Sequence, residues 1–345
     1  MGRKLLIDYG NPDREALLEA ARSIATGGIV VFPTETVYGI GANAYDDAAC
    51  SRIFSIKGRP QDNPLIVHVS SMEMLGEVAL IDRKWIQRLS RFWPGPLTVV
   101  ARSTGKVSTV ARTGLPTVAV RFPSSPVARA LIELAGVPIA APSANLSTRP
   151  SITDPVHALE EFSERVEYVI VSGKSPLGIE STVIDLTSPT IRLLRAGSTP
   201  VEEIEKVFGP VEVTDTARGV ATEERPVSPG AKYLHYSPET PLYLVTEDQM
   251  MSLGQNPGFS DYVFICSAQV GEAITNRKIV LGSESDLSAV ASRLFSALRD
   301  LDSMNARGGF IHLFPEHGIG LAVGNRIRKA SRPPTGEILA ALDRP

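Results

Sequence analysis

The chain has 345 residues, and its 35 basic and 38 acidic side chains give a formal net charge of −3. This length exceeds one average domain and fits two domains, each able to bury its own core. A net charge so close to zero provides no global positive field that would attract nucleic acid. Any contact with RNA would therefore have to be local.

Cysteine usage and hydropathy exclude further classes of protein. Cys50 and Cys266 are the two cysteines, and neither belongs to a CxxC pair. This excludes a structural zinc site and argues against a disulfide framework, so a reduced cytoplasm is the natural setting. Charge follows three apolar residues in the segment 1–8, and no run approaches the roughly 20 apolar residues of a bilayer span. We expect neither a signal peptide nor a membrane span.

Strand-like runs outnumber helical patterns in the first two-thirds of the chain. They lie at 29–32, 65–69, 97–101, 118–122, 138–141, 168–171, 182–186 and 191–195, and a helix is predicted over 47–57. The irregular spacing of the strands favours an α+β domain over a doubly wound one. We expect a large mixed, twisted β-sheet that forms a concave groove.

A change of composition marks the end of this domain. Residues 211–226 lack core-sized apolar side chains, and the Pro/Gly/Tyr-rich segment SPGAKYLHYSP follows at 228–238. Beyond it, strand-like runs at 242–245, 262–266 and 278–281 alternate with helical patterns such as 287–301. A small α/β, Rossmann-like domain is therefore predicted. The expected division is a first domain over 1–212, a linker over 213–238 and a C-terminal domain over 239–345.

Polar side chains gather after the first buried run. Pro33 stops the ladder of the strand at 29–32, so the hydroxyls of PTETVYG (33–39) leave the sheet edge together. The segments KGRP (57–60) and NPLIVH (63–68) add two cations and an imidazole. Such a place suits an anionic ligand.

Strand periodicity assigns these side chains to faces of the sheet. His68 points away from the apolar face formed by Leu65 and Val67, and Arg121 lies opposite the valines of its own strand. Arg195 is likewise in line with a face that should be buried. A closed core would not tolerate unpaired arginines, whereas a groove open to an anionic ligand would.

Each of these signals also has a purely structural interpretation. The hydroxyls of PTETVYG would cap a turn. Lys57 and Arg59 end a predicted helix, where cations complement the helix dipole. His68 would be a hydrogen-bonded structural histidine, and Arg121 would belong to a cross-strand ion pair. The gathering of hydroxyl, amide and cation in five segments at strand ends favours a functional site.

Two nucleotide-binding fingerprints nearly occur. Residues 39–44 satisfy G-x-G-x-x-A, but six residues separate Phe32 from Gly39, so these glycines do not open a tight strand-to-helix turn. The segment 104–106 lacks both the leading glycine and the following Ser/Thr of a P-loop. ATP would therefore be held by backbone amides and by separate lysine and arginine side chains.

The motifs PTETVYG, KGRP and NPLIVH, as they stand here, resemble the YrdC/Sua5 family of threonylcarbamoyl-AMP synthases. The segments APSAN (141–145), ESTV (180–183) and LRAG (194–197) recur in the family's order. SPGAKYLHYSP is similar to the linker of the longer, two-domain Sua5 branch, although Ala231 stands where that branch has a bulky apolar residue. The resemblance covers nearly the whole chain.

This resemblance implies a nucleotidyltransferase, an L-threonylcarbamoyladenylate synthase. Such an enzyme makes threonylcarbamoyl-AMP and pyrophosphate from L-threonine, bicarbonate and ATP, with Mg²⁺ and no organic prosthetic group. Its product supplies tRNA threonylcarbamoyl transferase proteins, which modify adenosine 37 of tRNA (t6A37). The resemblance also implies a cytoplasmic enzyme with at most weak direct binding of tRNA or double-stranded RNA and no membrane partner.

Matching to the family's motifs implies a role for individual residues. The implied catalytic residues are Lys57, Arg59, Ser143 and Asn145. Threonine would be bound by Thr36, His68, Arg121, Ala141 and Ser181, with Arg121 pairing its carboxylate. ATP would be bound by Arg59, Asn63, Thr117, Ser143, Ser151, Arg195 and Tyr236. The linker residues His235 and Tyr236 would close over the nucleotide, and Mg²⁺ would be held by phosphates and water without a dedicated protein ligand.

Two rival functions are weaker. A double-stranded RNA-binding or translation-associated module would use the groove for phosphates, but the net charge of −3 and the lack of a lysine-rich stripe argue against it. The carbamoyl-transferring lobe of a hydrogenase maturation factor is similar around two short motifs, KxR (57–59) and SxN (143–145). That protein also carries zinc-type cysteine pairs, which two lone cysteines exclude.

Overall fold

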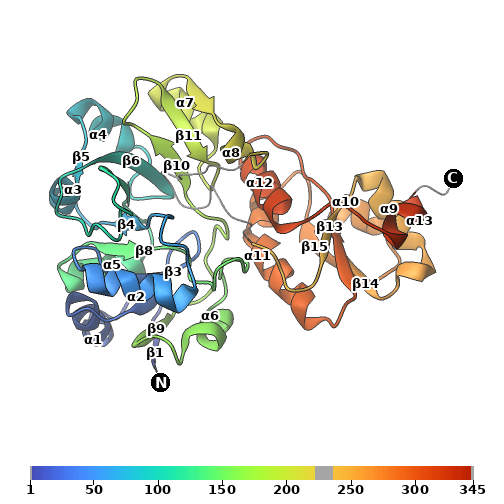
Figure 1. The fold of residues 1–345 in the computed structure, drawn as a ribbon, viewed down its shortest axis with the longest axis horizontal. Helices are drawn as coiled ribbons and strands as arrows, with labels where there is room; N and C mark the ends of the chain where they lie inside the picture. Colours follow the sequence, from blue (N-terminus) through green and yellow to red (C-terminus); the bar gives the residue numbers. More distant parts are fainter. Residues whose placement is uncertain (1, 222–235, 343–345) are drawn as a thin grey trace.

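The computed structural model describes residues 2–221 and 236–342, which form two bodies lying side by side (Figure 1). The strands of the first body are β1 (Arg3–Leu6), β2 (Val30–Pro33), β3 (Tyr38–Asn43), β4 (Ile66–His68), β5 (Ala79–Leu80), β6 (Leu97–Ser103), β7 (Thr117–Arg121), β8 (Ile139–Ala141), β9 (Tyr168–Val171), β10 (Thr182–Asp185), β11 (Ile191–Arg195) and β12 (Val211–Val213). Its helices are α1 (Arg14–Ala25), α2 (Asp47–Lys57), α3 (Met72–Val78), α4 (Arg83–Leu89), α5 (Pro126–Ala135), α6 (Pro155–Phe162), α7 (Val201–Phe208) and α8 (Asp215–Arg218).

The strands of the first body join into one mixed sheet. Their order is β1-β9-β2-β3-β8-β4-β7-β6-β10-β11-β12, and β5 pairs with β6. The sheet contains both parallel pairs, such as β4 with β7, and antiparallel pairs, such as β6 with β7. The predicted α+β fold with a large mixed sheet is confirmed, and every strand predicted from sequence is present within a few residues of its expected bounds.

Strand β3, which the sequence analysis did not predict, is the unpredicted strand next to the PTETVYG segment. It pairs with β2 as an antiparallel hairpin in which Pro33 faces Tyr38, so residues 34–37 form the hairpin turn. Pro33 thus ends β2, as expected, but the chain turns back and pairs with β2 instead of leaving the sheet. The glycines of β3 concealed the strand in the sequence. A Cβ at Gly41 would lie 2.7 Å from the Phe32 ring, so glycine permits a close approach between neighbours.

Apolar residues alternate along the sheet and bury both of its faces. Val30 and Phe32 pack with α1 and α5, whereas Val31 and Ile40 pack with α2. Helix α2 occupies the predicted bounds 47–57 because Asp46 caps its first turn and Gly58, with φ of 60°, ends it in the left-handed conformation. These layers hold rigidly the strand ends from which the polar residues project.

The second body has the predicted Rossmann-like architecture. It consists of β13 (Leu242–Leu244), α9 (Glu247–Gln255), the short 3₁₀ helix η1 (Pro257–Phe259), β14 (Tyr262–Ser267), α10 (Ala268–Glu272), β15 (Lys278–Gly282), α11 (Leu287–Ser303), β16 (Gly308–Ile311), α12 (Gly320–Ala330) and α13 (Glu337–Leu342). Its strands are all parallel, in the order β13-β16-β14-β15. Helices α9 and α10 pack on one face of this sheet, and α11 and α12 pack on the other.

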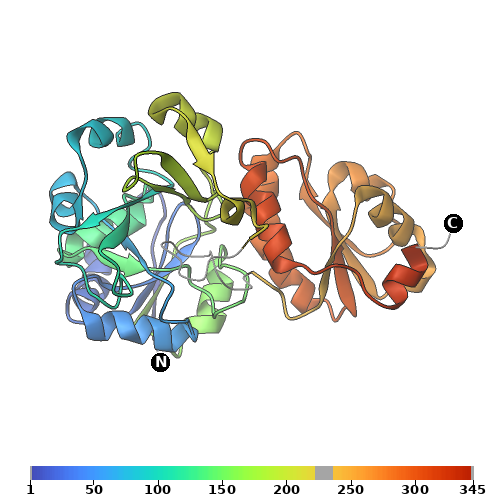
Figure 2. The same ribbon diagram turned by 45° about the horizontal axis from the view of Figure 1, so that its top comes forward.

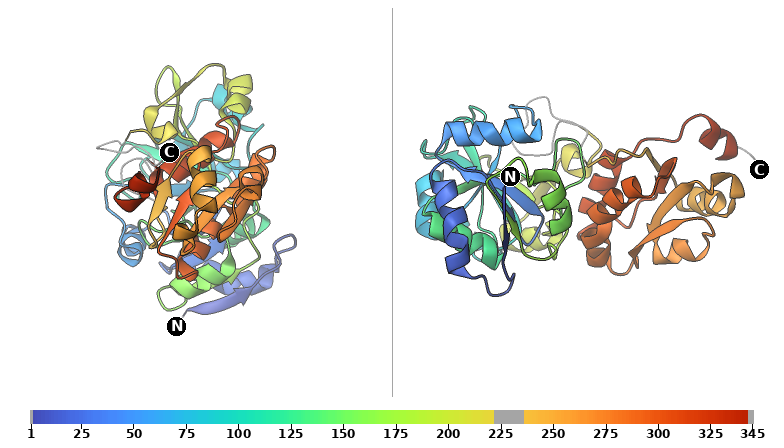
Figure 3. Two further views of the ribbon diagram at one scale, coloured as in Figure 1. Left: turned by 90° about the vertical axis from the view of Figure 1, so that its right-hand side faces the viewer. Right: turned by 90° about the horizontal axis from the view of Figure 1, so that it is seen from below.

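Helices α11 and α12 face the first body (Figure 2). One apolar cluster continues from the first sheet into both helices, through residues such as Ile179, Phe295 and Leu321. The two bodies are therefore packed together through a shared apolar cluster. The N-terminal strand lies within the first body, whereas the C-terminal helix lies at the far end of the second body (Figure 3).

The predicted linker, 213–238, is described only in part. Val213 ends β12, and α8 lies within the segment and packs against α12. Residues 222–235 lie outside the described ranges, so most of SPGAKYLHYSP does too, including His235. Within the described part of the chain, no helix combines the length and hydropathy needed to cross a membrane.

Candidate active site

A pocket lies where the hairpin turn, the end of α2 and the strands β4, β7 and β11 converge. Most of the residues that the sequence analysis selected line this cavity. They are Thr36, Lys57, Arg59, His68, Arg121, Ala141, Ser143, Asn145, Ser181, Arg195 and Tyr236. The concave groove expected from strand periodicity is thus present, and the side chains in it come from segments far apart in the sequence.

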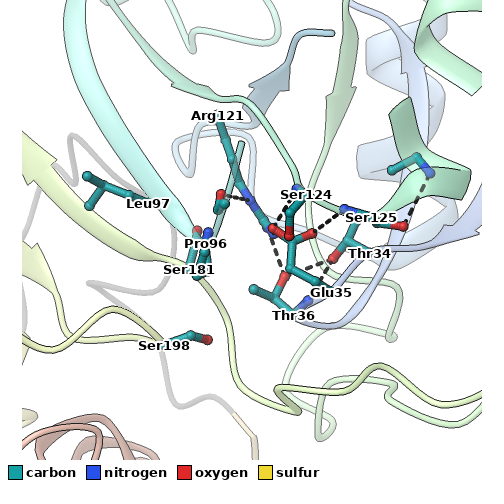
Figure 4. A network of polar contacts seen from close by, with 12 residues as sticks. Thr34, Glu35, Thr36, Pro96, Leu97, Arg121, Ser124, Ser125, Ser181 and Ser198 are labelled. Atoms are coloured by element: carbon teal, nitrogen blue, oxygen red, sulfur yellow. Dashed lines mark hydrogen bonds and ion pairs between the residues drawn. The ribbon is translucent and has the colours of Figure 1, made fainter. Parts of the chain in front are cut away.

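The hydroxyls of the hairpin turn serve both roles considered from sequence. Thr34 Oγ1 donates to the Val37 carbonyl at 2.6 Å, which closes the turn. Thr36 Oγ1 accepts a hydrogen bond from Arg121 Nη1 at 2.8 Å, as Figure 4 shows. The capping interpretation therefore holds for Thr34, while Thr36 faces the cavity and its cation.

Arg121 forms a buried ion pair whose partner the sequence did not identify. Its Nη2 lies 2.6 Å from Glu35 Oε1, and both side chains are almost fully buried. Burial by itself would raise the pKa of Glu35, but Arg121 and the Ser124 amide outweigh it and hold the pKa below its ordinary value. Arg121 is therefore ion-paired, but the cross-strand interpretation is wrong, because the partner lies in the hairpin turn and not on a neighbouring strand.

His68 is held neutral in the cavity wall. Burial and then the charge of Arg121 lower its pKa to about 3. Its Nδ1 donates to the Ile66 carbonyl at 3.1 Å, and its ring meets Phe32 edge-on. At neutral pH this imidazole can donate or accept a hydrogen bond, but its low pKa makes it a weak general base.

Lys57 links the KxR and SxN segments. Its Nζ donates to the Ser143 carbonyl at 2.6 Å and also to the Asn145 carbonyl. Ser143 Oγ in turn donates to Asn145 Oδ1 at 2.6 Å. Burial, followed by the charge of Arg59, lowers the pKa of Lys57 well below its ordinary value. The helix-end interpretation is therefore incomplete, because the ammonium contacts another loop and not the end of its own helix.

Two further guanidinium groups complete a cationic cluster. Arg59 donates to the carbonyls of Asn63 and Pro64, and burial lowers its pKa to about 10. Arg195 donates through Nε and Nη2 to the Ser181 carbonyl. With Lys57 and Arg121, these groups give the cavity an excess of positive charge. Backbone carbonyls orient the cations and leave their charge available to an anionic ligand.

Sequence models of two families match this chain. The Sua5/YciO/YrdC model, described as "Telomere recombination", matches residues 22–197, and a model described as "Threonylcarbamoyl-AMP synthase, C-terminal domain" matches residues 199–332. The threonylcarbamoyl-AMP synthase of Pyrococcus abyssi is 41% identical over 90% of this chain and 93% of its own length. The chain belongs to the Sua5 family.

A further relative and two solved structures are also similar to this chain. The threonylcarbamoyl-AMP synthase of Bacillus subtilis is 37% identical over 91% of this chain and 92% of its own length. A crystal structure of P. abyssi Sua5 complexed with L-threonine superposes with a TM-score of 0.89 at 40% identity, covering 95% of this chain and 97% of that one. The structure of Escherichia coli YciO, at 27% identity and a TM-score of 0.53, covers 57% of this chain and 96% of its own.

Three residues expected to contact ATP do not line the cavity of this Sua5-family chain. Thr117 begins β7, about 13 Å along the strand from Arg121. Ser151 is buried and donates to Glu180 Oε1 at 2.6 Å, so it reaches the cavity only through that carboxylate. Asn63 is fully buried, and neither polar atom of its amide has a partner. An unpaired buried amide is costly, which marks Asn63 as able to take a ligand or a water molecule.

Two carboxylates of this Sua5 site escaped the sequence analysis. Glu35 lies inside PTETVYG and Glu180 inside ESTV, so both stood within motifs that were interpreted for their hydroxyls. Glu180 lines the cavity and accepts a hydrogen bond from Arg326 Nε at 2.9 Å. Both carboxylates form ion pairs with arginines of the protein, Glu35 with Arg121 and Glu180 with Arg326.

Metal-binding potential in this Sua5-family chain is small among the described residues. Both oxygens of Glu180 are already engaged, by Arg326 and by Ser151. Elsewhere, Glu247, Glu284 and His312 lie close together in the C-terminal domain. However, His312 Nε2 accepts from the Ser267 amide, and Nδ1 donates to the Leu313 carbonyl, so neither ring nitrogen is free for a metal. The donors near the cavity fit a metal held mainly by a ligand's own phosphates.

Proposed function

We propose that this chain is an L-threonylcarbamoyladenylate synthase, which joins L-threonine, bicarbonate and ATP into threonylcarbamoyl-AMP with release of pyrophosphate. The observation that carries the proposal is the cationic cluster of Lys57, Arg59, Arg121 and Arg195 around one cavity. It occurs in a chain similar, over nearly its full length, to enzymes named for this activity. The reaction class is nucleotidyl transfer.

The geometry suits a reaction driven by alignment and charge neutralisation. Threonine carboxylated on its nitrogen is already an oxyanion, so its attack on the α-phosphorus of ATP needs no strong general base. As the new oxygen–phosphorus bond forms, the bond to the leaving pyrophosphate breaks. The neutral His68, with its low pKa, is consistent with such a mechanism.

We assign roles along the two sides of the cavity. Lys57, Arg59, Ser143 and Asn145 act on the reacting phosphates and the acyl-phosphate region. Thr36, His68, Arg121, Ala141 and Ser181 bind threonine. Arg195 and Tyr236 belong to the nucleotide side. Asn63, Thr117 and Ser151, which do not line the cavity, would act on the nucleotide from behind this side, Ser151 through Glu180. Arg121 already has a carboxylate partner, so threonine's carboxylate would share this guanidinium with Glu35.

The wider setting is part of the same proposal. Mg²⁺ bound with ATP would neutralise phosphate charge, and no described side chain is assigned to hold it. The product would pass to tRNA threonylcarbamoyl transferase proteins for t6A37 modification in the cytoplasm. Both cysteines are free and buried.

Pyrophosphate release tests the proposed function directly. Purified protein is incubated with ATP and Mg²⁺, and L-threonine and bicarbonate are supplied together or withheld singly from degassed buffer. Release is expected only with both, because their carbamate is the nucleophile. Equal release without threonine would identify a simple ATP pyrophosphatase and overturn the proposal.

A further inference from the structure

Helix α12 of the C-terminal domain places a buried arginine behind the cavity. Arg326 is fully buried, and its Nε donates to Glu180 Oε2 at 2.9 Å. Its guanidinium carbon lies 5.2 Å from the centre of the Tyr236 ring. Glu180 and Tyr236 both line the cavity, so a residue of the second domain contacts two parts of the site wall.

The charge of Arg326 favours the ionised form of Glu180. Burial by itself would raise the pKa of this carboxyl group, but Arg326 and then Arg195 outweigh burial and hold the pKa below its ordinary value. The carboxylate therefore stays ionised, and its second oxygen accepts the hydrogen bond from Ser151. Removal of Arg326 would take away the largest contribution that opposes burial, so the pKa of Glu180 would rise and its carboxylate would lose a hydrogen-bond donor.

Docking of the domains explains only part of this arginine's contacts, namely the hydrogen bond from its Nη1 to Asn325 Oδ1 at 2.9 Å. The neighbouring Asn325 already ties α12 to the first domain, through donors to the carbonyls of Thr216 and Ala217. The apolar cluster across the interface adds further contact. A buried ion pair gives little net stability compared with apolar residues of similar volume. In addition, Arg326 Nη2 has no acceptor among the described residues, which is a cost that docking alone would not require.

We propose that Arg326 is a positioning residue for the nucleotide side of the site, acting through Glu180 and the Tyr236 ring. This inference rests on the proposed function. It gives the C-terminal domain a specific part in catalysis, since the wall that faces ATP is completed by a side chain from α12. The threonine side, around Thr36 and His68, does not contact Arg326 and should be unaffected.

The test compares Arg326→Met and Arg326→Lys with Arg328→Met in the full-length protein. Arg328 is a matched control because it lies on the same helix, pairs with Glu316 and donates to the Arg218 carbonyl of the first domain, away from the cavity. Pyrophosphate release gives kcat and the KM values for ATP and L-threonine, and thermal unfolding gives the Tm of each variant.

For Arg326→Met, kcat/KM for ATP is expected to fall by roughly 10²-fold, because a small displacement of the residues that position a substrate has an effect of this size. The KM for L-threonine should stay within about twofold. Lysine should restore part of the loss because it keeps the charge beside Glu180. If Arg326→Met does not fold, Arg326→Lys still permits the comparison, with a smaller rise in the KM for ATP.

Three results would overturn the inference. The first is an unchanged kcat/KM for ATP in Arg326→Met or, if only the lysine variant folds, in Arg326→Lys. The second is an equal fall of kcat/KM for ATP in Arg328→Met. The third is an equal rise of the KM values for ATP and L-threonine. The last two would indicate general loosening of the interface. Failure of the proposed function is distinguishable, because the unsubstituted protein would then release no pyrophosphate in response to threonine and bicarbonate.

Discussion

The side-chain nitrogen of Lys57 lies 2.6 Å from the carbonyl oxygen of Ser143, which joins the end of α2 to the loop after β8. The same ammonium also contacts the Asn145 carbonyl. Since this lysine orients the loop and contributes charge to the cavity, its replacement affects two sources of catalysis together.

We therefore expect Lys57→Met to lower turnover by roughly 10²-fold or more, because the phosphates lose a fixed cation. Asn145→Ala should also impair turnover, since its amide donates to the carbonyls of Leu146 and Arg149 and shapes the same loop. The double variant should lose less than the product of the single losses, by a coupling of about 0.5–3 kcal/mol. Strictly multiplicative losses in kcat/KM would show that Lys57 and the loop act independently.

Glu35→Gln tests the buried ion pair with Arg121. The substitution leaves a guanidinium charge without its counterion in a buried place, and the free energy of unfolding is expected to fall by about 3–5 kcal/mol. Urea denaturation measures this change. Glu203→Gln is the control, because Glu203 pairs with Lys206 on an exposed helix surface and should cost at most about 1 kcal/mol. Equal costs in the two variants would mean that the Glu35–Arg121 pair adds nothing beyond a surface contact.

His68 should make stability depend on pH. Its pKa is about 3 in the fold and about 6.5 in the unfolded chain, so between these values the unfolded state binds more protons. The free energy of unfolding therefore rises with pH, by up to about 1.4 kcal/mol per unit. His68→Gln should flatten this slope between about pH 5 and 6.5, above the range in which most carboxylates titrate. An unchanged slope would indicate that His68 is charged in the fold or titrates normally.

Substrate selectivity should be real but limited. L-serine lacks the methyl group of threonine, and a pocket that packs one extra methyl discriminates by about 10- to 200-fold in kcat/KM. Competition between the two amino acids in the pyrophosphate assay measures this ratio. A ratio near one would mean that the site recognises only the groups that both amino acids share.

Local signals were sufficient to predict most of the strands and the helices α2 and α11. Helix α2 carries its own cap and stop in Asp46 and Gly58. The alternation along β4 correctly separated Val67, in the core, from His68, in the cavity wall. The hairpin strand β3 was missed because its glycines, which Phe32 requires for close packing, weaken the pattern of a strand.

Long-range pairings could not be predicted from these signals. Glu35, in the turn after β2, meets Arg121, at the end of β7, because of the strand order of the sheet, and Glu180 and Arg326 are 146 residues apart in different domains. No local periodicity reports which carboxylate will neutralise which arginine. Consequently the sequence identified the cations of the cavity but not the acids that fix them, nor the contribution of α12.

The most direct test is mass spectrometry of the nucleotide product formed from ATP, L-threonine and isotopically labelled bicarbonate. We expect an adenylate that contains both threonine and the labelled carbon, in amounts matching the pyrophosphate released. In Lys57→Met the yield of this adduct should fall in proportion to turnover. Production of AMP alone, or of a threonine adenylate without the label, would contradict the assignment of carboxylated threonine as the nucleophile in this cavity.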